Sequence, residues 1–223
     1  MTALDDAVAA IDAAAIALVQ DERGVRVEDY LTALAAATGE AALVDSAMFD
    51  IESTDLTPGS PVFGDEINRM LTGDETNLSA VPQSSVAGLL RDRLVPETVP
   101  LDAFAPLDGL YAHVASGVGT TPWGEVPLSV PDEHRPGIQP IRLAFGLRSA
   151  VEAAVAELQE GNGSAAAAGR RAPCALALAS GIERTSQAID VGIALTLALE
   201  VVFGMAKTVP MSRRAYEEQS GDA

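Results

Sequence analysis

Residues 191–206 read VGIALTLALEVVFGMA, the most apolar stretch of the 223-residue chain, with Glu200 as its one charged residue. A helix that is apolar around its whole circumference is buried, either at the centre of a bundle or in a subunit interface. The stretch is about 16 residues long, shorter than the roughly 20 residues that span a bilayer. It therefore predicts a buried core helix.

This stretch is the second half of one long predicted helix. The helix begins at Pro173, because proline is favoured at the first helical position, and runs to about Lys207. Within its first half, Glu183, Gln187 and Asp190 follow one another at i, i+4 and i+7. Side chains with this spacing share one stripe of a helix, so we expect a polar stripe ahead of the apolar part.

Glu200 has more than one interpretation. If its carboxylate faces inward, it requires an arginine partner, for which Arg142, Arg148 and Arg184 are the candidates, or its pKa is raised by desolvation. A carboxyl group with a raised pKa in a pocket is a candidate for an active site. A structural ion pair and plain surface exposure are the alternatives.

Helical periodicity continues toward the N-terminus. Apolar residues recur every three or four positions, and glycine or proline follows most of the periodic stretches, as at helix ends. The Arg148 to Glu152 spacing also predicts an i,i+4 ion pair. The expected helices are 5–19 (ending before Gly24), 27–38 (closed by Gly39), a short 40–48, 63–71 (ended by Gly73), 84–94, 101–118 and 141–158.

Two segments interrupt the helices. Residues 119–140 contain five prolines and Trp123, the single tryptophan, which predicts either a strap packed over the bundle or a functional loop. Residues 161–171 read as a flexible linker. We expect an all-α fold, a compact multi-helix bundle with a long C-terminal core helix and a Pro-rich strap, formed by a single domain over residues 1–210 and followed by a frayed polar tail over 211–223.

The charge balance excludes several classes of partner. The chain has 14 Lys and Arg residues against 32 Asp and Glu residues, a net charge of −18. This disfavours binding to nucleic acid and to an anionic membrane surface. A hydrophobic fraction of 48% argues against general disorder. The N-terminal residues lack the basic region of a secretory signal, so we expect a soluble protein in the cytoplasm.

Motifs for the commonest cofactors and for hydrolysis are absent. The sequence has no phosphate-binding glycine loop, no Gly-x-Ser-x-Gly elbow, no His-Glu-x-x-His and no Glu-x-x-His pair. We therefore expect no cofactor and no metal. The single cysteine, Cys174, precludes an internal disulfide. It is either a small buried hydrophobe or a thiol activated by the start of a helix.

Five residues are candidates for ligand binding: His113, Trp123, His134, Glu183 and Glu200. His113 lies in an apolar helical stretch, where it is either a general base or a buried histidine with a hydrogen-bond partner. His134 lies in the sequence PDEHRP, residues 131–136, which either binds a ligand or a cation or is a solvated loop. Trp123 belongs to the proline-rich segment.

Two functions are compatible with these observations. The first is a non-catalytic module that self-associates through its C-terminal helix and binds another protein or a small ligand. The second is an enzyme that acts on a small molecule in a pocket between helices, beneath a Pro-rich lid loop. It would use His113 or His134 with a carboxylate such as Glu66, Asp108 or Glu183.

Overall fold

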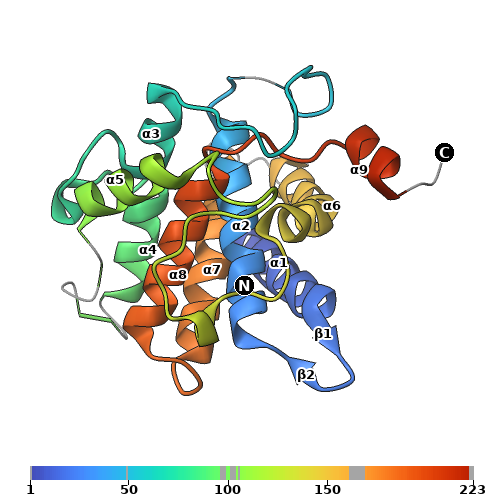
Figure 1. Ribbon diagram of the computed structural model, residues 1–223. Coiled ribbons are helices and arrows are strands. Elements are labelled where there is room, and N and C mark those ends of the chain that lie inside the picture. The colour runs from blue at the N-terminus through green and yellow to red at the C-terminus, as the bar shows by residue number, and fades with distance from the viewer. Residues whose placement is uncertain are drawn as a thin grey trace.

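The computed structural model describes residues 2–48, 50–95, 99–100, 104, 106–160 and 169–220, with side chains to residue 218. Nine α-helices form in this part of the chain and pack together (Figure 1), which confirms the all-α bundle. The elements in chain order are α1 (Ala3–Val19), β1 (Gln20–Asp21), β2 (Gly24–Val25), α2 (Val27–Asp45), α3 (Asp65–Thr72), η1 (Leu78–Ala80), α4 (Val86–Leu94), α5 (Leu107–Gly117), η3 (Asp132–His134), α6 (Pro140–Glu160), α7 (Arg171–Thr185), α8 (Val191–Met205) and α9 (Arg213–Ser220).

Helix α2 is the centre of the fold. Every residue from Asp29 to Leu43 is buried, on all sides of the helix. Helices α7 and α8 pack against one side of α2, and α6 and α1 pack against the other side (Figure 1). Many of the buried positions in α2 are alanines, and these small side chains let four neighbouring helices approach it.

The predicted end of the second helix at Gly39 is wrong, and so is the separate helix over residues 40–48. Residues 27–45 form one helix. A Cβ at position 39 would meet the carbonyl oxygen of Val202 and lie 2.9 Å from Cβ of Met205. Gly39 is therefore required by the close contact between α2 and α8, and it does not end a helix.

The prediction of one long C-terminal helix is also wrong. Helix α7 ends at Thr185 and α8 begins at Val191, so the chain turns between them. The side chain of Asp190 accepts hydrogen bonds from the backbone N–H groups of Gly192 and Ile193, at 2.9 and 3.2 Å. Asp190 is therefore the N-cap of a new helix, and the stripe that joined it to Glu183 does not form.

The expected helices between residues 63 and 118 are largely confirmed. Helix α3 ends at Gly73, which has a φ of +68°, a conformation that favours glycine. The side chain of Ser85 caps α4 by accepting a hydrogen bond from the N–H of Gly88. Helix α5 begins after Pro106, and residues 101–103 of the predicted helix lie outside the described residues.

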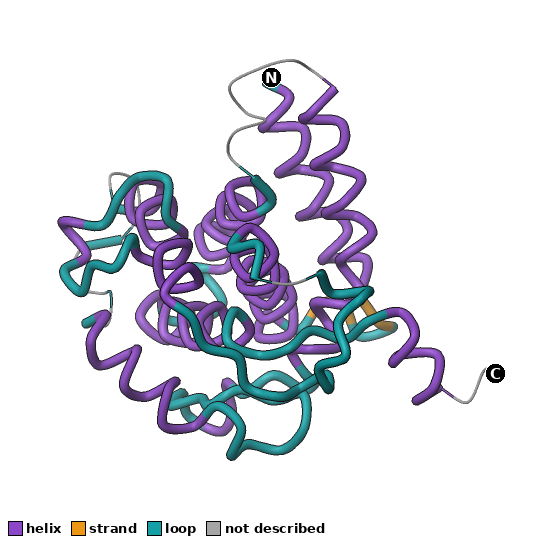
Figure 2. Tube along the Cα trace, turned by 90° about the horizontal axis from the view of Figure 1, so that it is seen from above, coloured by secondary structure: helices purple, strands orange, loops and turns teal. Residues whose placement is uncertain are grey.

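The proline-rich segment runs across the faces of α8 and α2 (Figure 1, yellow-green). Residues 119–139 include the short η3 turn and no α-helix or β-strand. Val126 contacts Gly204 of α8. The Asp29 carboxylate of α2 accepts hydrogen bonds from the N–H groups of Gly137 and Ile138, at 2.6 and 3.1 Å. Seen from above in Figure 2, long loops run along one side of the helices.

The two ends of the chain extend the bundle in small ways. Helix α1 confirms the first predicted helix. The strands β1 and β2 follow it in the chain and form a short hairpin in which Gln20 pairs with Val25. In the predicted tail, residues 213–220 form α9, where the ring of Tyr216 stacks on Phe145 of α6 with centroids 4.5 Å apart. The division into a domain and a tail stays a prediction, and most of the predicted linker, residues 161–168, lies outside the described residues.

Candidate functional site: a pocket between α2 and α6

The structure brings two of the five candidate residues together. His113 of α5 and Glu200 of α8 approach to 3.4 Å between Nε2 and Oε1. The other three lie elsewhere, each with a different neighbour. His134 Nδ1 is 3.0 Å from Oε1 of Glu28, Trp123 Nε1 donates to the carbonyl oxygen of Pro58 at 2.9 Å, and Arg93 donates to Glu183 at 3.0 Å.

Glu200 is buried, and its hydrogen-bond partner is Ser129, not one of the three candidate arginines. The Glu200 side chain is 4% exposed. The carboxylate accepts a hydrogen bond from the backbone N–H of Ser129 at 2.8 Å and another from the Ser129 hydroxyl at 2.5 Å. Because Ser129 donates its proton to the carboxylate and not to His113, the three groups do not form a nucleophile with its base. They join the proline-rich segment to α8.

Cys174 does not have an activated thiol. Its side chain is fully buried in α7. Burial raises the pKa of the Cys174 thiol, and the negative charges of Asp45 and Glu40 raise it further. A thiolate is disfavoured both in apolar surroundings and near carboxylates. The burial of Cys174 therefore supports the interpretation of a small buried hydrophobe over that of a reactive thiol.

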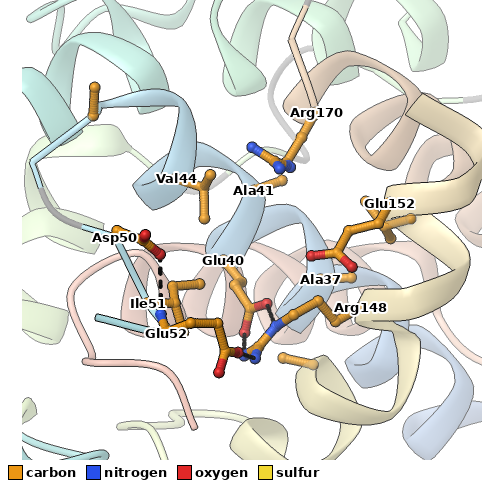
Figure 3. Close-up of a pocket in the computed structure, with 13 residues that line it drawn as sticks. Ala37, Glu40, Ala41, Val44, Asp50, Ile51, Glu52, Arg148, Glu152 and Arg170 are labelled. Atoms are coloured by element: carbon orange, nitrogen blue, oxygen red, sulfur yellow. Dashed lines mark hydrogen bonds and ion pairs between the residues drawn. The ribbon is translucent and has the colours of Figure 1, made fainter. Parts of the chain in front are cut away.

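A pocket of about 540 Å³ opens between α2, α6 and the loop that follows α2 (Figure 3). Its apolar wall follows directly from the sequence of the two helices. Ala37, Ala41 and Val44 lie on one face of α2, at i, i+4 and i+7, and face Ala144 and Val151 of α6. These side chains are too small to fill the space between the helices, and Ile51 of the loop covers only one edge. The space between the two helices therefore stays open, and its wall is apolar.

The floor of the pocket is an ion pair between the same two helices. Arg148 of α6 donates from Nε and Nη2 to the two carboxylate oxygens of Glu40 in α2, at 2.6 and 3.0 Å, and from Nη1 to Glu52 at 3.2 Å. Burial alone would lower the pKa of Arg148, but the hydrogen bonds and the charge of Glu40 outweigh it and raise the pKa. Arg148 therefore stays charged and fixed in place.

The predicted pair between Arg148 and Glu152 does not form, because Arg148 turns toward α2 instead. This leaves Glu152 at the side of the pocket, where Figure 3 shows its carboxylate directed into the space. Asp50 lies on the opposite side, and the Arg170 guanidinium lies at the rim. The backbone that carries Arg170 is held by the Asp45 carboxylate, which accepts hydrogen bonds from the N–H groups of residues 170 and 171, each at 3.1 Å.

A second hollow of about 550 Å³ adjoins this pocket and shares Glu52, Arg148 and Glu152 with it. Its outer side is formed by α9, including Arg213 and Tyr216. The Glu52 carboxylate accepts a hydrogen bond from the Arg213 N–H at 3.1 Å. Glu52 therefore connects the floor of the pocket to the first turn of the C-terminal helix.

Lys207, the single lysine of the chain, is not among the candidates taken from the sequence. It is 4% exposed. Its Nζ donates a hydrogen bond to Oδ1 of Asn68 at 2.8 Å and lies 5.2 and 5.7 Å from the ring centroids of Tyr111 and Phe63. Burial lowers the pKa of Lys207. No sequence motif marks this environment, because its members come from three separate segments, residues 63–68, Tyr111 and Lys207.

Comparison of the chain with models of protein families, with curated proteins and with solved structures finds no match. Among the described residues, no three His, Cys, Asp or Glu side chains are grouped so that they could hold a metal ion. None of the described helices has both the length and the apolar character needed to cross a bilayer.

Proposed function

We propose that the protein binds a small organic molecule with an apolar body in the pocket between α2 and α6. The observation that carries this proposal is a preformed space of about 540 Å³ with an apolar wall and a fixed ionic floor. Ligand sites in proteins are concave, mostly apolar and equipped with a few polar groups that orient the ligand. This pocket is concave and has an apolar wall, and six of its thirteen lining residues are charged.

The rigidity of the floor supports binding further. Arg148 and Glu40 hold each other through two hydrogen bonds, and their side chains are 13% and 7% exposed. A ligand that enters the pocket does not have to order these groups, so the entropic cost of binding is lower than at a flexible surface. Apolar atoms that replace water along Ala41, Val44 and Val151 supply the favourable free energy.

The pocket can be tested by filling it. Val44 is half-buried and lines the space, so Val44→Phe places a ring in it. In a screen of small molecules by ligand-observed NMR, we expect binders of the wild type to lose affinity for this variant. Val25→Phe makes the same change at an exposed position of the β1–β2 hairpin, and we expect it to retain binding. Binders that tolerate Val44→Phe would show that the pocket is not the site.

An enzymatic function has less support. In the described part of the chain neither histidine contacts Glu66, Asp108 or Glu183. His113 contacts Glu200 and His134 contacts Glu28 instead. The contacts of Val126 and Ser129 with α8, and of Gly137 and Ile138 with Asp29 of α2, support a packing strap in preference to a lid. An enzymatic function is therefore less well supported than a binding function.

Self-association remains a proposal of its own. The apolar residues of α8 that suggested it are covered within the same chain, since Leu195, Leu199 and Phe203 are at most 1% exposed. An interface between copies would have to use other apolar side chains, and Leu56 and Phe63 are about half exposed. Light scattering over a range of protein concentrations tests this proposal, and a constant monomeric mass would contradict it.

A further inference from the structure

The charges that line the pocket do not balance. Four carboxylates, those of Glu40, Asp50, Glu52 and Glu152, face two guanidinium groups, those of Arg148 and Arg170, which leaves a net charge of −2. A site that is both apolar and negatively charged selects ligands by charge as well as by shape. The sign of this excess indicates the class of ligand.

The excess belongs to groups on the solvent-exposed side of the pocket, since Asp50, Glu52 and Glu152 are all exposed. Arg148 is occupied by Glu40 and Glu52, and Glu52 also accepts from the backbone of Arg213. In the part of the chain that the structure describes, Glu152 has no ion-pair partner within 4.0 Å, and Figure 3 shows its carboxylate directed toward the apolar wall. Asp50 stands across the space, where its carboxylate accepts a hydrogen bond from the backbone N–H of Glu52 at 3.0 Å.

We infer that the ligand of this pocket is an organic cation, an amine whose ammonium group pairs with Glu152 and whose hydrocarbon body packs against Val44 and Val151. This inference rests on the proposed function, and it names the class of ligand for the same pocket. An ammonium group donates charge-assisted hydrogen bonds to a carboxylate. Glu152 is exposed, so a hydrocarbon body packed on Val44 and Val151 would displace part of the water around that pair, which strengthens the attraction.

Other classes of ligand fit the pocket less well. Among the described residues that line this pocket, Arg170 is the guanidinium group without an ion-pair partner within 4.0 Å, and a carboxylate or phosphate would meet it together with Asp50 and Glu152. A neutral molecule would remove water from Glu152 without replacing its hydrogen bonds, which is costly. A metal ion would gain nothing from the wall of Ala41 and Val44, and the described residues offer no group of three ligands for it. The net charge of −18 also raises the local concentration of cations.

Three probes of one shape and different charge test the inference: 2-phenylethylamine, 2-phenylethanol and phenylacetate. Their affinities are measured by isothermal titration calorimetry and ligand-observed NMR with the full-length chain at low ionic strength. We expect the amine to bind about tenfold more tightly than the alcohol and phenylacetate to bind most weakly. Added salt should weaken the binding of the amine and leave the affinity of the alcohol unchanged.

Substitutions in α6 test whether the Glu152 carboxylate causes the preference for the amine. Glu152→Gln keeps the shape of the side chain and removes its charge, so the affinity of the amine should fall about tenfold while that of the alcohol stays the same. The matched control is Glu157→Gln, an exposed position on the same helix outside the pocket, where no affinity should change.

The outcomes separate the inference from the proposed function. If the alcohol binds as well as the amine, or Glu152→Gln has no effect on the amine, the ligand class is wrong. In that case the pocket itself is still supported when Val44→Phe abolishes binding of the alcohol. If amine binding survives Val44→Phe, or if none of the three probes binds at millimolar concentration, the inference is overturned together with the proposed site.

Discussion

Arg148 of α6 and Glu40 of α2 form a two-point ion pair, with Nε and Nη2 of the arginine at 2.6 and 3.0 Å from the two carboxylate oxygens. Each group satisfies the other in a largely buried position, where an isolated charge would be costly. The pair also fixes the distance between the two helices beside the pocket. The same contact therefore contributes to the stability of the bundle and to the shape of the candidate site.

Removing one member of this pair should destabilise the protein strongly. In Glu40→Ala, Arg148 stays buried with only Glu52 as a partner, and Glu52 is half exposed. We expect the free energy of unfolding to fall by about 3 kcal/mol, as measured by urea denaturation. The double variant Glu40→Leu, Arg148→Met removes both charges and should recover most of the loss. A single variant as stable as the wild type would mean that the pair is not buried in solution.

Two glycines in helices should respond to alanine in opposite ways. A Cβ at Gly39 would meet the backbone of α8, whereas a Cβ at Gly109 of α5 would meet no atom within 4 Å. Gly39→Ala should therefore lower the stability by about 2 kcal/mol through overpacking. Gly109→Ala should raise it by about 0.5–1 kcal/mol, because alanine is the better helix former. Thermal unfolding of both variants checks the difference, and equal effects would argue against the close packing of α2 on α8.

Two of the glycines predicted to mark helix ends, Gly39 and Gly73, show what a single sequence can predict. Gly73 does end a helix, with a positive φ, but Gly39 lies inside one. Both follow an apolar periodic stretch, so local pattern does not distinguish them. The difference comes from α8, more than 160 positions later in the sequence, whose backbone leaves no room for a side chain at residue 39. Periodicity predicted most helices, while their interruptions depended on tertiary contacts.

The sequence predicted the candidate site less well than it predicted the fold. The i,i+4 spacing of Arg148 and Glu152 correctly predicted that both lie on one face of α6. The predicted ion pair between them does not form. A partner 108 positions away, Glu40, outcompetes the neighbour because it is buried and binds through two hydrogen bonds. The same is true of Glu200, where Ser129 of a loop takes the place of an arginine. Charged partners that are distant in the sequence leave no local signal.

The contact between Glu200 and Ser129 should hold the proline-rich segment on α8. Glu200→Gln keeps one acceptor oxygen and loses the other, so one of the two hydrogen bonds from Ser129 is lost. We expect the variant to be less stable by about 2 kcal/mol and the amide of Ser129 to exchange faster with solvent. Glu125→Gln, at an exposed position of the same segment, is the control and should change neither quantity. Unchanged exchange at Ser129 would show that the carboxylate does not anchor the segment.

Lys207 should make the stability of the protein depend on pH in the alkaline range. Burial lowers its pKa in the folded state below the ordinary value of 10.5. Between these two values the unfolded chain binds more protons than the folded chain, so the free energy of unfolding rises with pH. Below the lowered pKa both states are protonated, and the cost of burying the ammonium group is constant. Above 10.5 both states are neutral, and the dependence ends.

Lys207→Met isolates this effect, because the chain has no other lysine. The facing titratable group, Tyr111, is present in both proteins, and its pKa is raised by burial. We expect the wild type to gain stability relative to the variant as the pH rises from 7 toward 10.5, as measured by urea denaturation at several pH values. Lys207→Arg, which stays charged throughout, should show no such gain. A difference between the wild type and Lys207→Met that is independent of pH would mean that Asn68 and the two aromatic rings compensate fully for the burial of the charge.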